Sequence, residues 1–190
     1  MEKIWSCLML VLASLCAVHM KPLDDERHRA LIRSGYVHYP GAGYYRLAKK
    51  PASWGEGRRN CQQEGAILSI VNSPSEAGIL KALYLSEGLT KLEKYENDDI
   101  SEISRDSNST ENPPIPTSGT IHIGFHDLFV EGEYLTVRGE PIIATGFVRW
   151  KPGYPVSDDL HNCGAFDTNQ FILDIPCELE LPYVCEISEL

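Results

Sequence analysis

Four cysteines constrain what this chain can fold into more than any other feature, and they are Cys61, Cys163, Cys177 and Cys185. An even number of cysteines in an oxidising compartment favours two disulfides that frame a small domain. Four cysteines allow three pairings, and their spacing does not choose among them. The chain has no close CxxC pairs of the kind that a zinc ribbon shows, so a zinc site is disfavoured.

Residues 1–18 have the layout of a secretory signal peptide. Lys3 precedes an apolar run from Cys7 to Leu12, and small residues follow it. The run is shorter than the stretch of about 20 apolar residues that a membrane-spanning helix needs. We therefore expect cleavage near residues 16–19, a secreted, extracellular protein without a membrane span, and removal of the two remaining cysteines with the signal.

The charge pattern excludes one class of partner and marks one segment. The net charge is −10, which repels nucleic acid at long range. Residues 89–119 are rich in acids, Ser, Asn and Pro and lack apolar periodicity, so we predict a mobile acidic loop. Asn108 opens an Asn-Ser-Thr sequon within it and is a predicted N-glycosylation site.

The remaining sequence predicts an α+β domain. Residues 19–35 are strongly charged and predict an N-terminal tail or a short helix ended by Gly35. Ser53 and Ser73 each begin a capping-box pattern with a glutamate three residues later, which predicts two helices. Short apolar segments between turn residues then predict antiparallel strands at 120–125, 133–137, 146–150, 163–167, 171–175 and 182–187.

The order of these segments resembles the C-type lectin-like domain over residues 36–188, interrupted by the acidic loop. The most specific segments are HIGFHD at 122–127, and IPC at 175–177 with YVCE at 183–186. The segment HIGFHDLFVEGEYLTV is especially similar to insect haemolymph lectins of the lipopolysaccharide-binding or immulectin type. The resemblance implies disulfides between Cys61 and Cys185 and between Cys163 and Cys177.

The resemblance also implies where a principal calcium and sugar site would lie. The family's calcium-binding tripeptide falls at Tyr154-Pro155-Val156, a later glutamate at His161, and an Asn-Asp pair at Leu173-Asp174. Calcium needs about six to eight hard oxygen ligands, and only Asp174 keeps a carboxylate, so this site is predicted to be lost. The predicted ligand-binding loop comprises Tyr154, Pro155, Val156, Asp158, Asp159 and His161, together with Asp174. Asp158 and Asp159 also fit a solvated turn, and Pro155 matches a cis proline that shapes the loop.

An auxiliary calcium site of the family matches Asp127, Glu131 and Asn162, which keep oxygen donors. The alternative for Asp127 and Glu131 is that they bond and solvate a turn. Calcium at this auxiliary site is the only cofactor that the sequence suggests.

No catalytic constellation is recognisable. His122 and His126 are four residues apart in a strand-like segment, where such residues lie about 13 Å apart, and no glutamate stands between them. His122 and the aromatic residues Trp54, Phe147 and Trp150 are predicted to pack in the core. Two binding functions remain: a secreted lectin for microbial glycans or lipopolysaccharide, or a module that binds a protein ligand instead of sugar.

Overall fold

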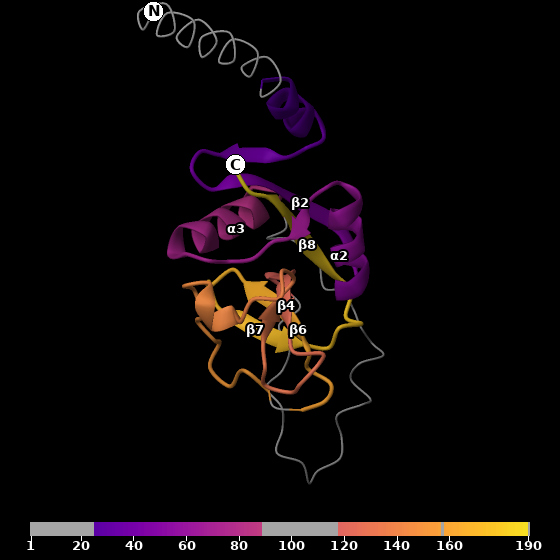
Figure 1. The fold of residues 1–190 in the computed structure, drawn as a ribbon, viewed down its shortest axis with the longest axis vertical. Helices are drawn as coiled ribbons and strands as arrows, with labels where there is room; N and C mark the ends of the chain where they lie inside the picture. Colours follow the sequence, from indigo (N-terminus) through magenta and orange to yellow (C-terminus); the bar gives the residue numbers. More distant parts are fainter. Residues whose placement is uncertain (1–24, 89–117, 157, 190) are drawn as a thin grey trace, which may run out of the picture. The chain divides into compact units, whose positions relative to one another are not determined.

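The computed structural model describes residues 25–88, 118–156 and 158–189 (Figure 1). The predicted signal segment, Asn108 and residues 89–117 lie outside these ranges. The chain divides into two compact units, Met1–His38 and Tyr39–Leu190. In the first unit, residues 25–33 form a helix, and Gly35 follows it with a left-handed φ of 89°. The predicted short helix before Gly35 is therefore present.

The described residues of the second unit form two α-helices and a sheet, in the α+β arrangement that the sequence predicts. A short strand, β1 (Val37–Tyr39), leads into it. Its elements in chain order are β2 (Gly43–Ala52), α2 (Trp54–Gln63), β3 (Ile67–Leu68), α3 (Pro74–Ser86), β4 (Thr120–His126), β5 (Leu135–Thr136), the 3₁₀ helix η2 (Ile142–Ala144), β6 (Cys163–Asp167), β7 (Ile172–Ile175) and β8 (Leu181–Ile187).

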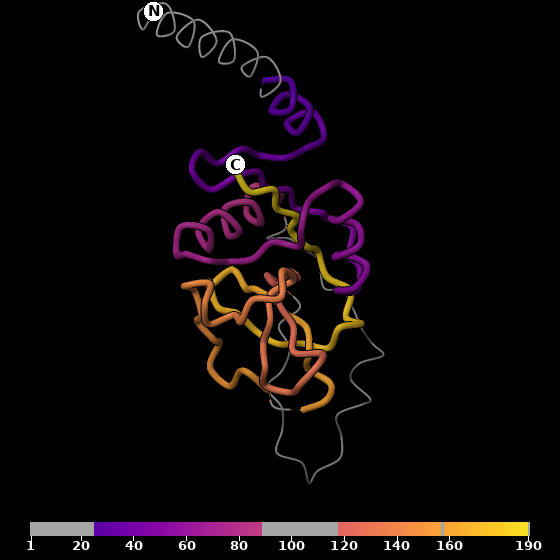
Figure 2. Tube along the Cα trace, in the orientation of Figure 1, coloured from indigo at the N-terminus to yellow at the C-terminus, as the bar shows by residue number. Residues whose placement is uncertain are grey.

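Neighbouring strands of the second unit follow the order β2-β8-β4-β6-β7, with β3 beside β8 and β5 beside β4. All of these pairs are antiparallel except β4 with β8, which pair in parallel at His122 and Tyr183. The sequence predicts antiparallel strands, and among the described pairs only β4 with β8 departs from this, because β8 lies between β2 and β4 and runs parallel to β4. Helix α2 contacts β8 and β4, and α3 contacts β2 (Figures 1 and 2).

Helix α2 begins with the predicted capping box. The Ser53 hydroxyl accepts a hydrogen bond from the amide of Glu56, and the Glu56 carboxylate accepts one from the amide of Ser53. The indole of Trp54 donates to the carbonyl of Ile123 at 2.8 Å, which anchors the first turn on β4. A side chain at Gly57 would stand 3.1 Å from the Tyr183 ring, so the helix lies close against β8.

Helix α3 keeps half of its predicted capping box. The Ser73 hydroxyl caps the amide of Glu76, as expected. The Glu76 carboxylate instead accepts hydrogen bonds from the amide of Asn72 at 2.8 Å and from the hydroxyl of Tyr45 at 3.0 Å. A buried carboxylate needs strong donors, and the phenol of β2 supplies one, so Glu76 ties α3 to the sheet.

Two disulfides join Cys61 to Cys185 and Cys163 to Cys177. This is the pairing that the family resemblance implied. The first ties α2 to β8 across 124 residues, and the second joins the start of β6 to the segment that follows β7. The second disulfide therefore fixes the end of the loop before β6 to the segment that follows β7.

The predicted strand at 146–150 is wrong. Of these residues only Trp150 pairs, in an isolated bridge with Ile172. Gly146 has a left-handed φ of 94°, and Phe147 turns into the core, so the segment packs as an extended loop. The strand expected at 133–137 shortens to Leu135–Thr136.

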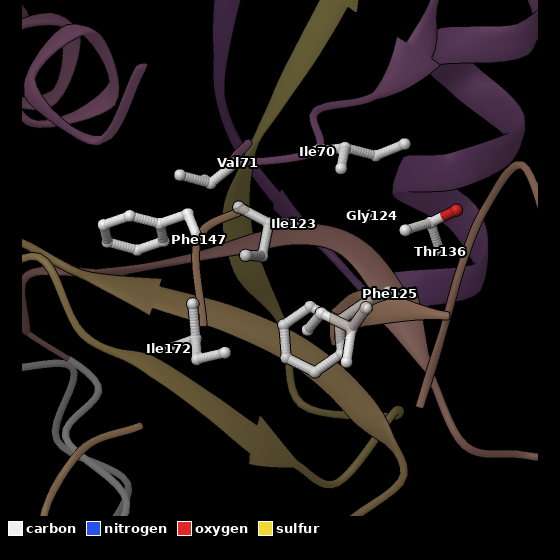
Figure 3. A pocket seen from close by; sticks show the side chains of 9 residues that line it. Ile70, Val71, Ile123, Gly124, Phe125, Thr136, Phe147 and Ile172 are labelled. Carbon is white, nitrogen blue, oxygen red and sulfur yellow. The ribbon is translucent and has the colours of Figure 1, made fainter. Parts of the chain in front are cut away.

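The core contains a cavity of about 10 Å³, which is about the space of one water molecule. It is lined mainly by apolar side chains, which Figure 3 shows, from Ile70, Val71, Ile123, Gly124, Phe125, Thr136, Ile142, Phe147 and Ile172. A sugar ring does not fit there. Over the described residues, no helix is long and apolar enough to cross a membrane.

Candidate functional site

The predicted site residues lie on two loops and one strand. Asp127 and Glu131 belong to the turn after β4, residues 154–156 and 158–162 lie in the loop before β6, and Asp174 lies on β7. A hydrogen bond from the amide of Asp127 to the carbonyl of Asn162, 3.2 Å long, connects the two loops. The structure therefore brings the predicted principal and auxiliary positions into one region.

Asp174 is completely buried, and its contacts are internal. Its carboxylate accepts a hydrogen bond from the Tyr134 hydroxyl at 2.7 Å and from the amide of Val156 at 2.9 and 3.0 Å. Burial raises the pKa of Asp174, while these two donors oppose the rise. Burial also raises the pKa of Tyr134, and its hydrogen bond to Asp174 raises it further. Asp174 thus holds the loop before β6 against β7.

The neighbours of Asp174 form an apolar cluster. Tyr154, Val156 and Leu173 are all buried in it, together with Ala165, Ile175 and Leu181. The peptide bond between Tyr154 and Pro155 is cis, as the resemblance implied. Burial raises the pKa of Tyr154, and its hydroxyl has no hydrogen-bond partner among the described residues. Side chains at Val156 and Leu173 offer no oxygen ligand, so a cation at this place would meet hydrocarbon.

The imidazole of His161 and the carboxylate of Asp158 contact each other instead of both facing solvent. The Asp158 carboxylate lies 2.7 Å from Nδ1 of His161 and accepts hydrogen bonds from the amides of Leu160 and His161. Such side-chain to backbone bonds are typical of a turn built by an aspartate. His161 is buried, whereas Asp159 is exposed.

The auxiliary positions include a carboxylate oxygen without a partner. Oδ2 of Asp127 accepts a hydrogen bond from the amide of Gly132 at 2.9 Å. Oδ1 of Asp127 is buried and has no hydrogen-bond partner among the described residues. The side-chain nitrogen of Asn162 donates to the carbonyl of Asp159 at 2.8 Å, whereas Glu131 is exposed.

These loops form an acidic cluster, which we define as Asp127, Glu131, Asp158 and Asp159. Partial desolvation raises the pKa of Glu131, and the other three carboxylates raise it further. The four carboxylates lie on two loops that the hydrogen bond between Asp127 and Asn162 connects, so the cluster has a negative potential. Within the described ranges, no group of three or more His, Cys, Asp and Glu side chains is placed to hold a metal ion.

Sequence reasoning missed an exposed apolar patch on the same two loops, which we define as Leu128, Phe129, Val130 and Leu160. Phe129 is 79% exposed and Leu160 is 70% exposed. The uninterrupted run LFV next to Asp127, where the pattern predicts a turn, is the signal that could have revealed the patch. Tyr134, the donor to Asp174, carried no motif that could have identified its role.

Three rings in edge-to-face contact include Phe129 of this patch. The imidazole of His126 makes edge-to-face contacts with Trp54 and Phe129, at centroid distances of 5.4 and 5.3 Å. The guanidinium of Arg58 lies over the Trp54 ring at 5.9 Å. Burial lowers the pKa of His126, and Arg58 lowers it further. His122, by contrast, is buried in the core and lies 2.8 Å from the carbonyl of Leu179, as its predicted core role requires.

No family model matches the chain. A curated relative is the haemolymph lipopolysaccharide-binding protein of Periplaneta americana, which is 37% identical over 159 residues. The alignment covers 83% of this chain and 54% of the relative, so the chain spans about half the length of that protein.

Solved structures similar to this chain carry C-type lectin folds. A Kupffer cell C-type lectin receptor matches with a TM-score of 0.64 and 20% identity, over 91% of this chain and 95% of that one. The carbohydrate-recognition domain of the mouse scavenger receptor C-type lectin matches with a TM-score of 0.59 and 15% identity, over 82% and 94%.

A calcium-independent type II antifreeze protein matches with a TM-score of 0.59 and 16% identity, over 82% of this chain and 93% of that one. The chain thus has the C-type lectin-like fold and is a sequence relative of the haemolymph lipopolysaccharide-binding protein.

Proposed function

We propose that this protein is a secreted, non-catalytic lectin that recognises microbial surface glycans, lipopolysaccharide among them. The observation that carries the proposal is the 37% identity to a protein named for lipopolysaccharide binding, spread over 83% of this chain. The other parts of the proposal are a signal peptide at residues 1–18, a recognition domain at 36–188 and a glycan on Asn108.

The recognition surface that we propose is the outer side of the loop before β6. Asp159 is exposed there, and Asp158 and His161 fix the shape of the turn. Carboxylates and backbone groups on such a turn bind sugar hydroxyls by direct hydrogen bonds, without a cation between them.

We also propose that the principal calcium site is degenerate. Two of its positions, Val156 and Leu173, are buried hydrocarbon, and the carboxylate of Asp174 is already bonded to Tyr134 and Val156. A cation there would lose most of its water shell and gain too few oxygen ligands in return.

An auxiliary calcium ion fits the chain better. The buried, unpartnered Oδ1 of Asp127 is a hard oxygen donor, the carbonyl of Asn162 accepts the amide hydrogen of Asp127, and Glu131 follows in the same turn. Bound there, calcium would supply positive charge that relieves the repulsion among the acids of the cluster and stiffens both loops. Calcium should therefore raise the melting temperature of the wild type and not that of Asp127→Asn.

Binding of the mature protein to immobilised lipopolysaccharide, and to its polysaccharide freed of lipid, tests the proposed function. We expect saturable binding to both, which soluble polysaccharide competes away. The variant Asp159→Ala should weaken this binding, whereas the matched exposed variant Glu140→Ala should leave it unchanged. Absence of binding to either surface would refute the glycan function.

A further inference from the structure

The exposed apolar patch and the acidic cluster occupy the same two loops, and together they suggest a second kind of ligand. The patch gathers large apolar side chains from the turn after β4 and from the loop before β6. Large contiguous apolar patches on soluble proteins often mark contacts with a partner. Val156 and Leu173 are buried, whereas the side chains of the patch are exposed and available to a partner.

Phe129 has the properties of an interface anchor. Its ring is 79% exposed, yet its edge contact with His126, itself packed on Trp54, holds it in place. An aromatic side chain that is already held loses little conformational entropy when a partner covers it. The fold therefore presents Phe129 in a fixed position at the surface.

The charge around the patch decides which partner fits. Glu131 and Asp159 are exposed beside it, and Asp127 and Asp158 lie in the same loops. Negative potential attracts cationic groups and repels phosphate groups of lipids and of nucleic acids. A lipid surface or a lipid phosphate is thus disfavoured, and a cationic partner with apolar side chains is favoured.

We propose that Leu128, Phe129, Val130 and Leu160, with the acidic cluster, form a docking surface for a protein segment that carries adjacent cationic and apolar side chains. The apolar side chains of the segment cover Phe129, and its lysine or arginine groups pair with Glu131 and Asp159. This interaction differs from glycan recognition in needing the apolar patch and a cationic partner, although both use the exposed carboxylate of Asp159.

The test measures binding of the full mature protein to a synthetic helical peptide of leucine and lysine, in the presence of a chelator so that no divalent cation neutralises the acids. Two peptides of the same length serve as comparators, one of lysine alone and one of leucine and serine. We expect the leucine and lysine peptide to bind at least tenfold more tightly than either comparator, since both apolar and cationic groups contribute.

Variants separate the apolar contribution to peptide binding from the electrostatic contribution. Phe129→Ser should weaken binding of the leucine and lysine peptide at least tenfold, and Glu131→Gln about threefold with a weaker dependence on salt. The controls are Ile143→Ser, which alters a side chain that is 77% exposed on η2, and Glu140→Gln; both should stay within about twofold of the wild type. Circular dichroism confirms that each variant is folded.

Two results would overturn the proposal. One is a loss of affinity in Phe129→Ser no larger than that in Ile143→Ser. The other is binding to vesicles that contain lipid A or anionic phospholipid, dependent on Phe129, with none to the peptide, which would assign the patch to a lipid. Polysaccharide binding, measured in parallel, should be unchanged in Phe129→Ser, so failure here is distinct from failure of the lectin function.

Discussion

The hydroxyl of Tyr134 donates a 2.7 Å hydrogen bond to the carboxylate of Asp174, 40 residues further along the chain. The same carboxylate accepts a hydrogen bond from the amide of Val156. The Asp174 carboxylate therefore joins three segments of the domain. Its role in this structure is to stabilise the loop, and that role has measurable consequences.

Removing the Asp174 carboxylate should destabilise the protein. In Asp174→Ala, the amide of Val156 and the hydroxyl of Tyr134 lose their acceptor inside the protein, which costs about 2 to 4 kcal/mol in the free energy of unfolding. Asp174→Asn keeps one acceptor and should cost about 1 kcal/mol. Urea unfolding at pH 7 measures both. The exposed control Asp159→Ala should change stability by less than about 0.5 kcal/mol, and equal losses in the two alanine variants would contradict the internal role of Asp174.

Replacing Tyr154 by phenylalanine should not reduce stability. The Tyr154 hydroxyl is buried and lacks a partner among the described residues, so it was desolvated without compensation. Tyr154→Phe keeps the ring in the apolar cluster and should raise the free energy of unfolding by about 1 kcal/mol. Tyr134→Phe is the matched comparison, because its hydroxyl is bonded, and should lower that energy by about 1 kcal/mol. Thermal or urea unfolding of the two variants should give opposite signs; a loss in both would show that Tyr154 has a partner.

His122 should make the protein sensitive to acid. Burial lowers its pKa from 6.5 to about 4, so between these values the unfolded chain binds a proton that the folded protein does not. The contribution of neutral His122 to the free energy of unfolding is fully present above about pH 6.5. It is lost as the pH falls towards 4, and the free energy of unfolding then decreases by about 3 kcal/mol in all.

The variant His122→Phe isolates this effect. The difference in unfolding free energy between wild type and variant should shift in favour of the variant as the pH falls from 6.5 to 4. Buried Asp174 and Glu186 have raised pKa values, but they are present in both proteins and cancel in the difference. A constant difference across this range would mean that His122 takes up its proton equally well in the folded state.

The sequence predicted the frame of this domain better than its loops. Ser53 and Ser73 predict the starts of both helices, because a capping hydroxyl with a glutamate three residues later is a local sequence signal. The disulfides required the family resemblance, since four cysteines alone allow three pairings. The strand predicted at 146–150 does not form, because the apolar pattern of this segment reflects burial of Phe147 in a loop and not strand pairing.

The site was predictable only in part, for a physical reason. The absence of a side-chain oxygen at Val156 and Leu173 follows from residue chemistry and is visible in the sequence. The partnership of Tyr134 with Asp174 depends on how β7 packs against a distant loop, which no local pattern encodes. The exposure of Phe129 likewise depends on the turn that follows β4, and an apolar run in sequence more often indicates a strand.

The most direct test of the account is the calcium dependence of lipopolysaccharide binding, measured with the mature wild type and with folded Asp174→Asn, each in calcium and in excess chelator at a temperature well below unfolding. The account predicts that both proteins bind, and that Asp174→Asn responds to chelator as the wild type does, to within about twofold in affinity, because the principal site has no ion to lose and any effect of calcium arises at the auxiliary positions. Binding that disappears in chelator, returns with calcium and is abolished in Asp174→Asn would show that a working calcium and sugar site is centred on Asp174.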